Sequence, residues 1–175
     1  MPNTVAWTNV YAQTSVQGGD TIANQGAATV FASTWTMPAN FLTAGRVVRI
    51  VARGVYSSLA ALAGNLTLDI MAGTTVLATT GAQALVVNLT NNGWEVAGDF
   101  VCVTTGAGGT VEAQGKSLLE TALTTAAIEL MQNAATIALN TTISQVIGIR
   151  VTFSVPSASN TIQQRLLLVD IGGAQ

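Results

Sequence analysis

The chain lacks histidine and has few charged residues. Of its 175 residues, six are Lys or Arg and eight are Asp or Glu, so that only 8% of the chain is charged. An ordinary soluble domain is about 25% charged. The lack of imidazole excludes Ser-His-Asp and Cys-His catalysis as well as histidine-ligated metal sites. This composition argues against an enzyme and favours a building block whose surface is partly covered by other subunits.

Further absences exclude several classes of partner. Cys102 is the only cysteine, so an intrachain disulfide is excluded, and its apolar neighbours predict a small buried side chain rather than a reactive thiol. Lys and Arg are not clustered as nucleic-acid binding requires. The uncharged stretch 130–149 is interrupted by Gln, Asn, Ser and Thr, which do not suit a membrane span. We expect no nucleic acid, no membrane, no metal and no cofactor.

Two catalytic alternatives depend on weak patterns. A glycosidase needs only two carboxylates across a sugar, but Glu95 and Asp99 fall on the polar face of a predicted strand, where structural carboxylates are commoner. Gly115-Lys116-Ser117 resembles the end of a phosphate-binding loop. Such a loop requires a further glycine where this chain has Thr110. We therefore predict no catalytic and no cofactor-binding residue.

Apolar residues recur with a period of two along most of the chain. The alternation is clearest over residues 65–72, 93–104, 147–155 and 161–171, and a period of two is typical of half-buried strands. Shorter segments around 29–37, 45–56, 82–89 and 110–118 add further strands. The spacing predicts an all-β antiparallel sandwich or barrel.

Two regions depart from this pattern. Residues 1–28 are mostly polar and predict an extended N-terminal arm or peripheral segment before a β domain over 29–175. Trp7 and Tyr11 on this arm either pack on the parent domain or dock on a neighbouring subunit, because Trp and Tyr are favoured in interfaces. Over residues 117–138, Leu, Ala and Met recur at nearly helical spacing, so that two short strands and a helix both remain open.

Arginine and valine alternate over residues 46–53. Arg49 and Arg53 share one predicted strand face with Val47, Val51 and Val55. This face is too apolar for ordinary solvent-exposed surface and too charged for a core. A subunit interface and a solvated edge with extended arginine stems are both open interpretations. We take Trp7, Tyr11, Arg49 and Arg53 as the candidate contact residues with sister subunits or a protein shell.

One stretch resembles a known class of proteins. Residues 31–50 (FASTWTMPANFLTAGRVVRI) and 54–57 (GVYS) resemble a segment that is common in structural proteins of tailed bacteriophages. Looser similarity continues through residues 73–78, 93–96, 104–107 and 157–162. The resemblance covers most of the chain from Gly18 onward, and the first stretch is its specific part.

The resemblance implies a trimeric jelly-roll protein of the virion. We expect a capsid decoration or cement protein that forms a homotrimer, binds the major capsid protein on the outer capsid surface and is assembled in the host cytoplasm. The alternative within this class is a trimeric tail-fibre or head-fibre component that binds a host surface glycan. A free carbohydrate-binding module is less consistent with so few aromatic residues.

Overall fold

A computed structural model of the chain describes residues 7–14, 20–59, 61–122, 124–133 and 135–172. These residues form fourteen strands and no helix, which confirms the predicted all-β class. The described part accordingly contains no helix that is long and apolar enough to cross a membrane. The strands are β1 (Thr8–Thr14), β2 (Asp20–Ala23), β3 (Thr29–Val30), β4 (Trp35–Met37), β5 (Val47–Ser57), β6 (Asn65–Ala72), β7 (Thr75–Thr79), β8 (Gln83–Ala84), β9 (Asn92–Thr104), β10 (Thr110–Ala122), β11 (Thr125–Gln132), β12 (Ile137–Ala138), β13 (Gln145–Phe153) and β14 (Thr161–Gly172).

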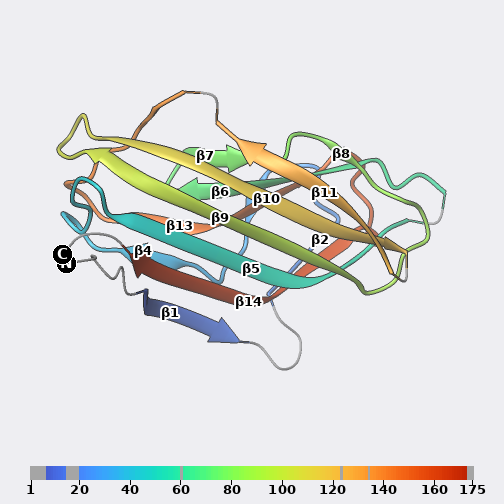
Figure 1. Ribbon diagram of the computed structural model, residues 1–175. Helices are drawn as coiled ribbons and strands as arrows, with labels where there is room; N and C mark the ends of the chain where they lie inside the picture. Colours follow the sequence, from blue (N-terminus) through green and yellow to red (C-terminus); the bar gives the residue numbers. More distant parts are fainter. Residues whose placement is uncertain (1–6, 15–19, 60, 123, 134, 173–175) are drawn as a thin grey trace.

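The strands form a two-layered antiparallel sandwich (Figure 1). The first layer, here called the large sheet, has the order β1-β14-β5-β9-β10-β11. The second layer has the order β7-β6-β13-β3, and it joins the large sheet where Gln132 of β11 pairs with Thr79 of β7. The short strands β2, β4, β8 and β12 extend these layers.

The connectivity is that of a jelly roll. In the large sheet β14 lies between β1 and β5, and in the second layer β13 lies between β3 and β6. The chain thus passes between the layers, with its last strands inserted among its first, as in a double-sheet jelly roll. The β10-β11 hairpin is added beyond β9 and widens the large sheet.

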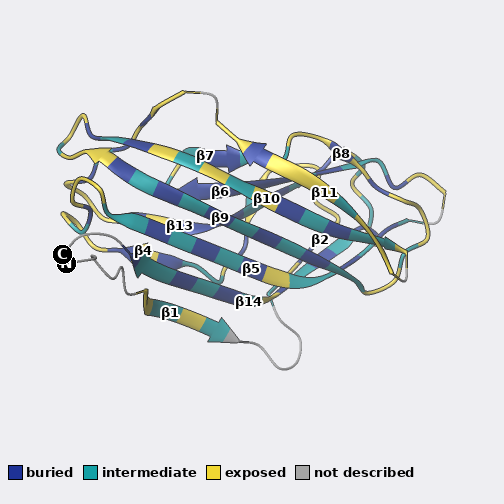
Figure 2. Ribbon diagram, viewed as in Figure 1, coloured by how far each residue is buried: buried dark blue, intermediate teal, exposed yellow. Residues whose placement is uncertain are grey.

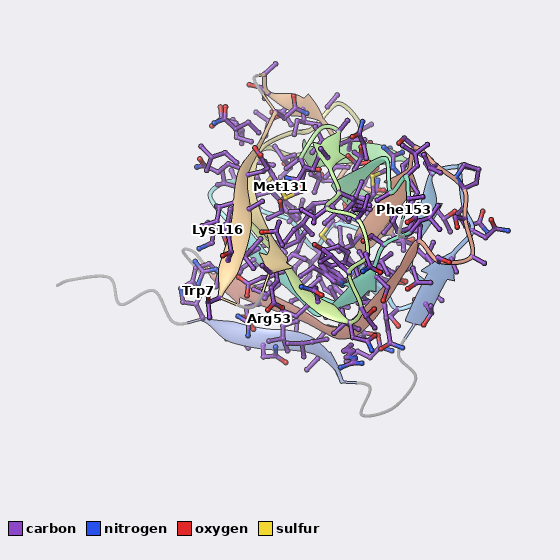
Figure 3. All side chains as sticks on the ribbon, turned by 90° about the vertical axis from the view of Figure 1, so that its right-hand side faces the viewer. Trp7, Arg53, Lys116, Met131 and Phe153 are labelled. Carbon is purple, nitrogen blue, oxygen red and sulfur yellow. The ribbon has the colours of Figure 1, made fainter. Side chains whose placement is uncertain are left out.

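Side chains from both layers fill the space between them (Figure 3). On β9 the predicted inward residues Trp94, Val96 and Phe100 are all buried, as the period of two requires. The ring of Phe31 stacks parallel to Trp94 with centroids 5.9 Å apart, and the indole N–H of Trp94 donates to the Gln163 carbonyl oxygen at 3.0 Å. Aromatic contacts of this kind anchor the start of β9 between the layers.

The described residues of the ambiguous region 117–138 form parts of β10, β11 and β12 with their connections, and none of them is helical. Residues of β10 pair with β9 on one side and with β11 on the other, for example Leu118 with Ile128. A helix would have left the outer edge of β9 without a partner. Pairing with β10 satisfies the backbone N–H and C=O groups on that edge of β9. The free energy gained by this pairing exceeds the helical preference of Ala and Leu.

The described parts of the N-terminal segment are extended and lie along the large sheet. Strand β1 pairs with residues 166–171 of β14, and β2 pairs with residues 161–164 of the same strand. Residues 1–6 and 15–19 of the predicted arm lie outside the described residues.

Gly115, Lys116 and Ser117 lie within β10, where Ser117 is buried. A paired strand cannot wrap its successive N–H groups around a phosphate, so the geometry of a phosphate-binding loop is absent from this segment.

Candidate interaction surface

The outer face of the large sheet carries the predicted arginine-valine pattern. On β5 the side chains of Val48, Ile50 and Ala52 are buried, whereas Arg49 and Arg53 point away from the second layer. The predicted division of this strand into two faces is therefore confirmed. Valines 47, 51 and 55 on the arginine side are half-buried, because neighbouring side chains of the sheet cover them in part.

Arg49 lies between a carboxylate and an indole ring. Its Nε donates to Asp99 Oδ1 at 2.9 Å, and its guanidinium carbon lies 4.0 Å from the centroid of the Trp7 ring. The planar guanidinium can stack on an indole while it binds a carboxylate in its own plane. Trp7 also lies against Gly172, where an added Cβ would be 3.1 Å from the ring. Two candidate residues, Trp7 and Arg49, are thus in direct contact.

Arg53 has a partner of its own within the chain. Its Nε lies 2.6 Å from Glu95 Oε2, and both side chains remain accessible to solvent. Exposed ion pairs of this kind contribute about 0–1 kcal/mol to stability. Each ion pair also removes the local net charge from the outer face, because the arginine and its carboxylate partner lie side by side there.

Tyr11 belongs to the other side of β1. It pairs with Val169, a core residue, and its half-buried ring packs against the hydrophobic core. Trp7, in contrast, is 42% exposed. Of the four candidate residues, Trp7, Arg49 and Arg53 lie on the outer face, whereas Tyr11 packs inward.

An apolar patch on the β10-β11 hairpin was missed by sequence reasoning. Ile128 and Leu130 project from β11 and are 64% and 69% exposed, next to Leu118 and Lys116 of β10. Figure 2 shows β11 as one of the most exposed strands of the sheet. The alternation of Ile128, Glu129 and Leu130 was visible in the sequence, but flanking Ala and Leu residues at helical spacing obscured it.

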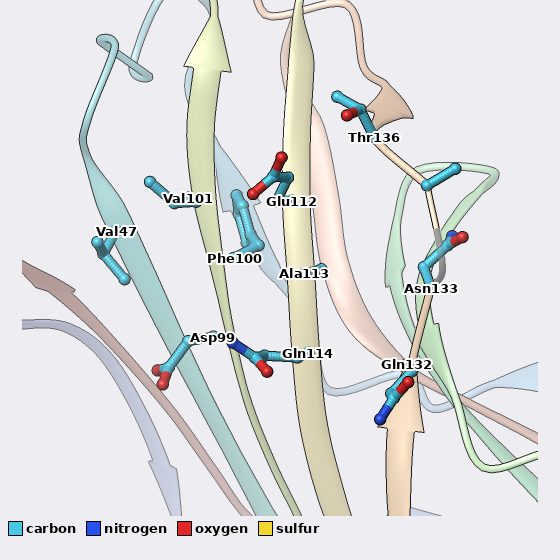
Figure 4. Close-up of a pocket in the computed structure, with 11 residues that line it drawn as sticks. Val47, Asp99, Phe100, Val101, Glu112, Ala113, Gln114, Gln132, Asn133 and Thr136 are labelled. Atoms are coloured by element: carbon cyan, nitrogen blue, oxygen red, sulfur yellow. The ribbon is translucent and has the colours of Figure 1, made fainter.

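A shallow hollow of about 650 Å³ lies at the end of the outer face (Figure 4). Its polar lining comes from Asp99 and residues of β10 and β11, including Glu112, Gln114 and Gln132, while Val47 and Val101 supply apolar walls. Among the described residues, no group of three or more Cys, Asp or Glu side chains is placed to hold a metal ion. The hollow offers hydrogen-bonding groups, among them the carboxylates of Asp99 and Glu112.

Two titrating groups of the described residues, Tyr56 and Cys102, have altered acidity, and both are in the interior. Tyr56 is buried, and its hydroxyl donates to the Glu120 carbonyl oxygen at 2.6 Å. Desolvation, with a smaller contribution from the Glu120 charge, raises the pKa of Tyr56 to about 12. Burial also raises the pKa of the Cys102 thiol, against a smaller opposing effect of Arg46. Cys102 is therefore a buried thiol rather than a thiolate nucleophile.

Comparison with known proteins gives no family for this chain. No protein-family model matches it, and no curated protein matches it.

Proposed function

We propose that the protein is a structural protein of a tailed-phage virion that decorates the outer capsid surface as a homotrimer and stabilises the head. The observation that carries this proposal is the outer face of the large sheet. It is a wide jelly-roll surface on which Arg49 and Arg53 are neutralised within the chain and alternate with half-buried valines. Such a face has the mixed character of an interface: apolar, weakly charged and with an exposed Trp at its margin.

The proposed mechanism is mechanical. A trimer that spans neighbouring subunits of the major capsid protein contributes the free energy of its buried surface to the assembled shell. Expansion of the shell would have to break these contacts, so that bound trimers oppose the outward pressure of packaged DNA. This role requires no catalytic group, which agrees with the composition of the chain.

Copy number on the virion tests the proposal directly. Quantitative mass spectrometry of purified particles should find the chain in hundreds of copies over the head, and capsids stripped of it should lose heat resistance. A few copies located near the tail would instead indicate the fibre role with a host glycan as ligand. Stripped capsids that keep their full heat resistance would contradict the stabilising role.

A matched pair of variants tests the surface itself. Val51→Lys adds a third cation between Arg49 and Arg53 on the outer face and should weaken binding to stripped capsids by about tenfold or more, because an unpaired charge would be desolvated. Val146→Lys places the same charge at an exposed position of β13 in the second layer and should leave binding unchanged. Equal binding by both variants would show that the outer face is not the surface of contact.

A further inference from the structure

The large sheet has two open edges. Strand β1 pairs with β14, and among the described residues no strand lies on its other side. Strand β11 pairs along its length with β10, whereas its other edge meets β7 only through Gln132 and Thr79. Both ends of the sheet thus present backbone N–H and C=O groups without a strand partner in the described part of the chain.

Neither edge strand contains a lysine or a proline that would protect it against strand pairing. Natural edge strands are commonly guarded by lysine, proline or very short length. Strand β1 is seven residues long and β11 is eight, and the single charged residue in the two strands is Glu129. A bulge after Asn9 interrupts β1, but its pairing is regular from Tyr11 to Thr14. On β11 only Met131 is buried within the chain. The two edges therefore have the character of strands that are covered in an assembly.

The strand directions allow the two edges to meet. Every neighbouring pair in the six-stranded sheet is antiparallel, so β1 and β11 run in opposite directions. A second copy that continues the sheet in the same sense presents its β1 antiparallel to β11 of the first copy. Ile128 and Leu130 on the outer face would then be continued by Ala12 and Leu168 of the added copy.

The charge on β11 favours this head-to-tail pairing over pairing of two β11 edges. Glu129 is the one charged residue of β11, and β1 contains none. Joining β11 to β11 along its length would bring Glu129 of both copies close together, whereas joining β11 to β1 places Glu129 next to an uncharged strand.

We propose that the chain assembles with itself by pairing β11 of one copy with β1 of the next. Each copy then uses two different surfaces, and such a heterologous contact forms a ring when the rotation between neighbouring copies closes and an open filament when it does not. A ring of three would account for the proposed trimer. The inference goes beyond the virion function, because the edges can pair whether or not a capsid is the final partner.

Charge placed on β11 should separate the copies. In sedimentation experiments, the Ile128→Lys/Leu130→Lys variant should associate about a hundredfold more weakly than the unmodified chain, because lysines on an edge strand oppose pairing and the apolar contacts of Ile128 and Leu130 with the added copy are lost. The control, Val86→Lys/Val87→Lys, changes two exposed valines of a loop and should associate normally. A circular-dichroism spectrum with unchanged strand content verifies that the β11 variant is folded.

Mixing two blocked variants distinguishes the proposed pairing from other modes. Ala12→Lys blocks β1 and should be monomeric alone. Mixed with the β11 variant, it leaves one intact β11 and one intact β1, so the mixture should form a dimer of one copy each and nothing larger. Self-association of the Ala12→Lys variant to the normal extent, or a monomeric unmodified chain, would overturn the proposal. Normal association of the folded β11 variant would do the same.

These outcomes are independent of the virion test. An oligomer that depends on β11 and β1 but is absent from purified heads would contradict the proposed function alone. A chain abundant on heads that keeps its oligomeric state in the β11 variant would contradict the edge pairing alone.

Discussion

At the level of single residues, most of the arginines interact with other residues of the same chain. Three of the five arginines form ion pairs with carboxylates, namely Arg49, Arg53 and Arg150. Arg46 lies over the ring of Phe41, 5.0 Å from its centroid, and also donates to the Phe41 carbonyl oxygen. The surface is therefore even poorer in free charge than the composition indicates.

The ion pairs differ strongly in burial, and their removal should differ accordingly. The Asp69 side chain is 5% exposed and lies 2.7 Å from Arg150 Nη2. Arg150→Ala would leave this carboxylate buried without its partner, and should lower the free energy of unfolding by about 3 kcal/mol. Arg53→Ala removes a solvent-accessible pair and should cost at most about 1 kcal/mol. Urea unfolding of both variants measures the difference, and equal losses would contradict a structural role for the buried pair.

At the level of elements, the strands with clear alternation were predictable and the others were not. The predicted strands 65–72, 93–104, 147–155 and 161–171 correspond to β6, β9, β13 and β14, because one face of each strand packs against the opposite layer, although β13 ends at Phe153 rather than at residue 155. The two-residue strands β3, β8 and β12 are too short to show a period. Strands β10 and β11 were ambiguous because the gain from pairing with β9 depends on tertiary contacts that local sequence does not contain.

The close approach of β9 and β10 depends on two facing glycines. Gly98 and Gly115 are register partners, and a Cβ on Gly115 would lie 2.7 Å from the Ala97 carbonyl oxygen and 2.9 Å from Gly98 Cα. Gly115→Ala must push these backbones apart and should lower the free energy of unfolding by about 1–3 kcal/mol. Gly108→Ala is the control, because a Cβ there has no neighbour within 4 Å. A Gly115→Ala protein as stable as the Gly108→Ala protein would show that the strands separate at little cost.

At the level of the whole molecule, the candidate surface was only partly predictable from the sequence. The period of two predicted that Arg49 and Arg53 lie on one face, because residues four apart in a strand point to the same side whatever the strand pairs with. Their partners Asp99 and Glu95, and the contact of Trp7 with Arg49, depend on the register of strands far apart in the sequence. Register is set by packing and turns of the entire fold, and alternation within one strand does not specify it.

The low charge of the molecule predicts a weak effect of salt on its self-association. Raising NaCl from about 0.1 M to about 1 M shortens the screening length from about 10 Å to about 3 Å. An interface of apolar side chains and backbone hydrogen bonds should keep its dissociation constant within about threefold, because few charges are there to be screened. Sedimentation at both salt concentrations provides the measurement. A tenfold or greater weakening at high salt would show that ion pairs hold the copies together.

The position of β14 in the large sheet has a consequence for biosynthesis. This last strand lies between β5 and the pair β1 and β2, so that the first strands have no partner in the sheet until residues 161–172 have left the ribosome. Folding of this sheet thus requires that β14 has been synthesised, and the contacts that complete the sheet join strands far apart in the sequence, which slows folding. A chain interrupted before residue 161 would expose β5 on one side and release β1 and β2 altogether. Only chains that include β14 would therefore present both edges of a finished sheet, which restricts assembly to copies synthesised beyond residue 172.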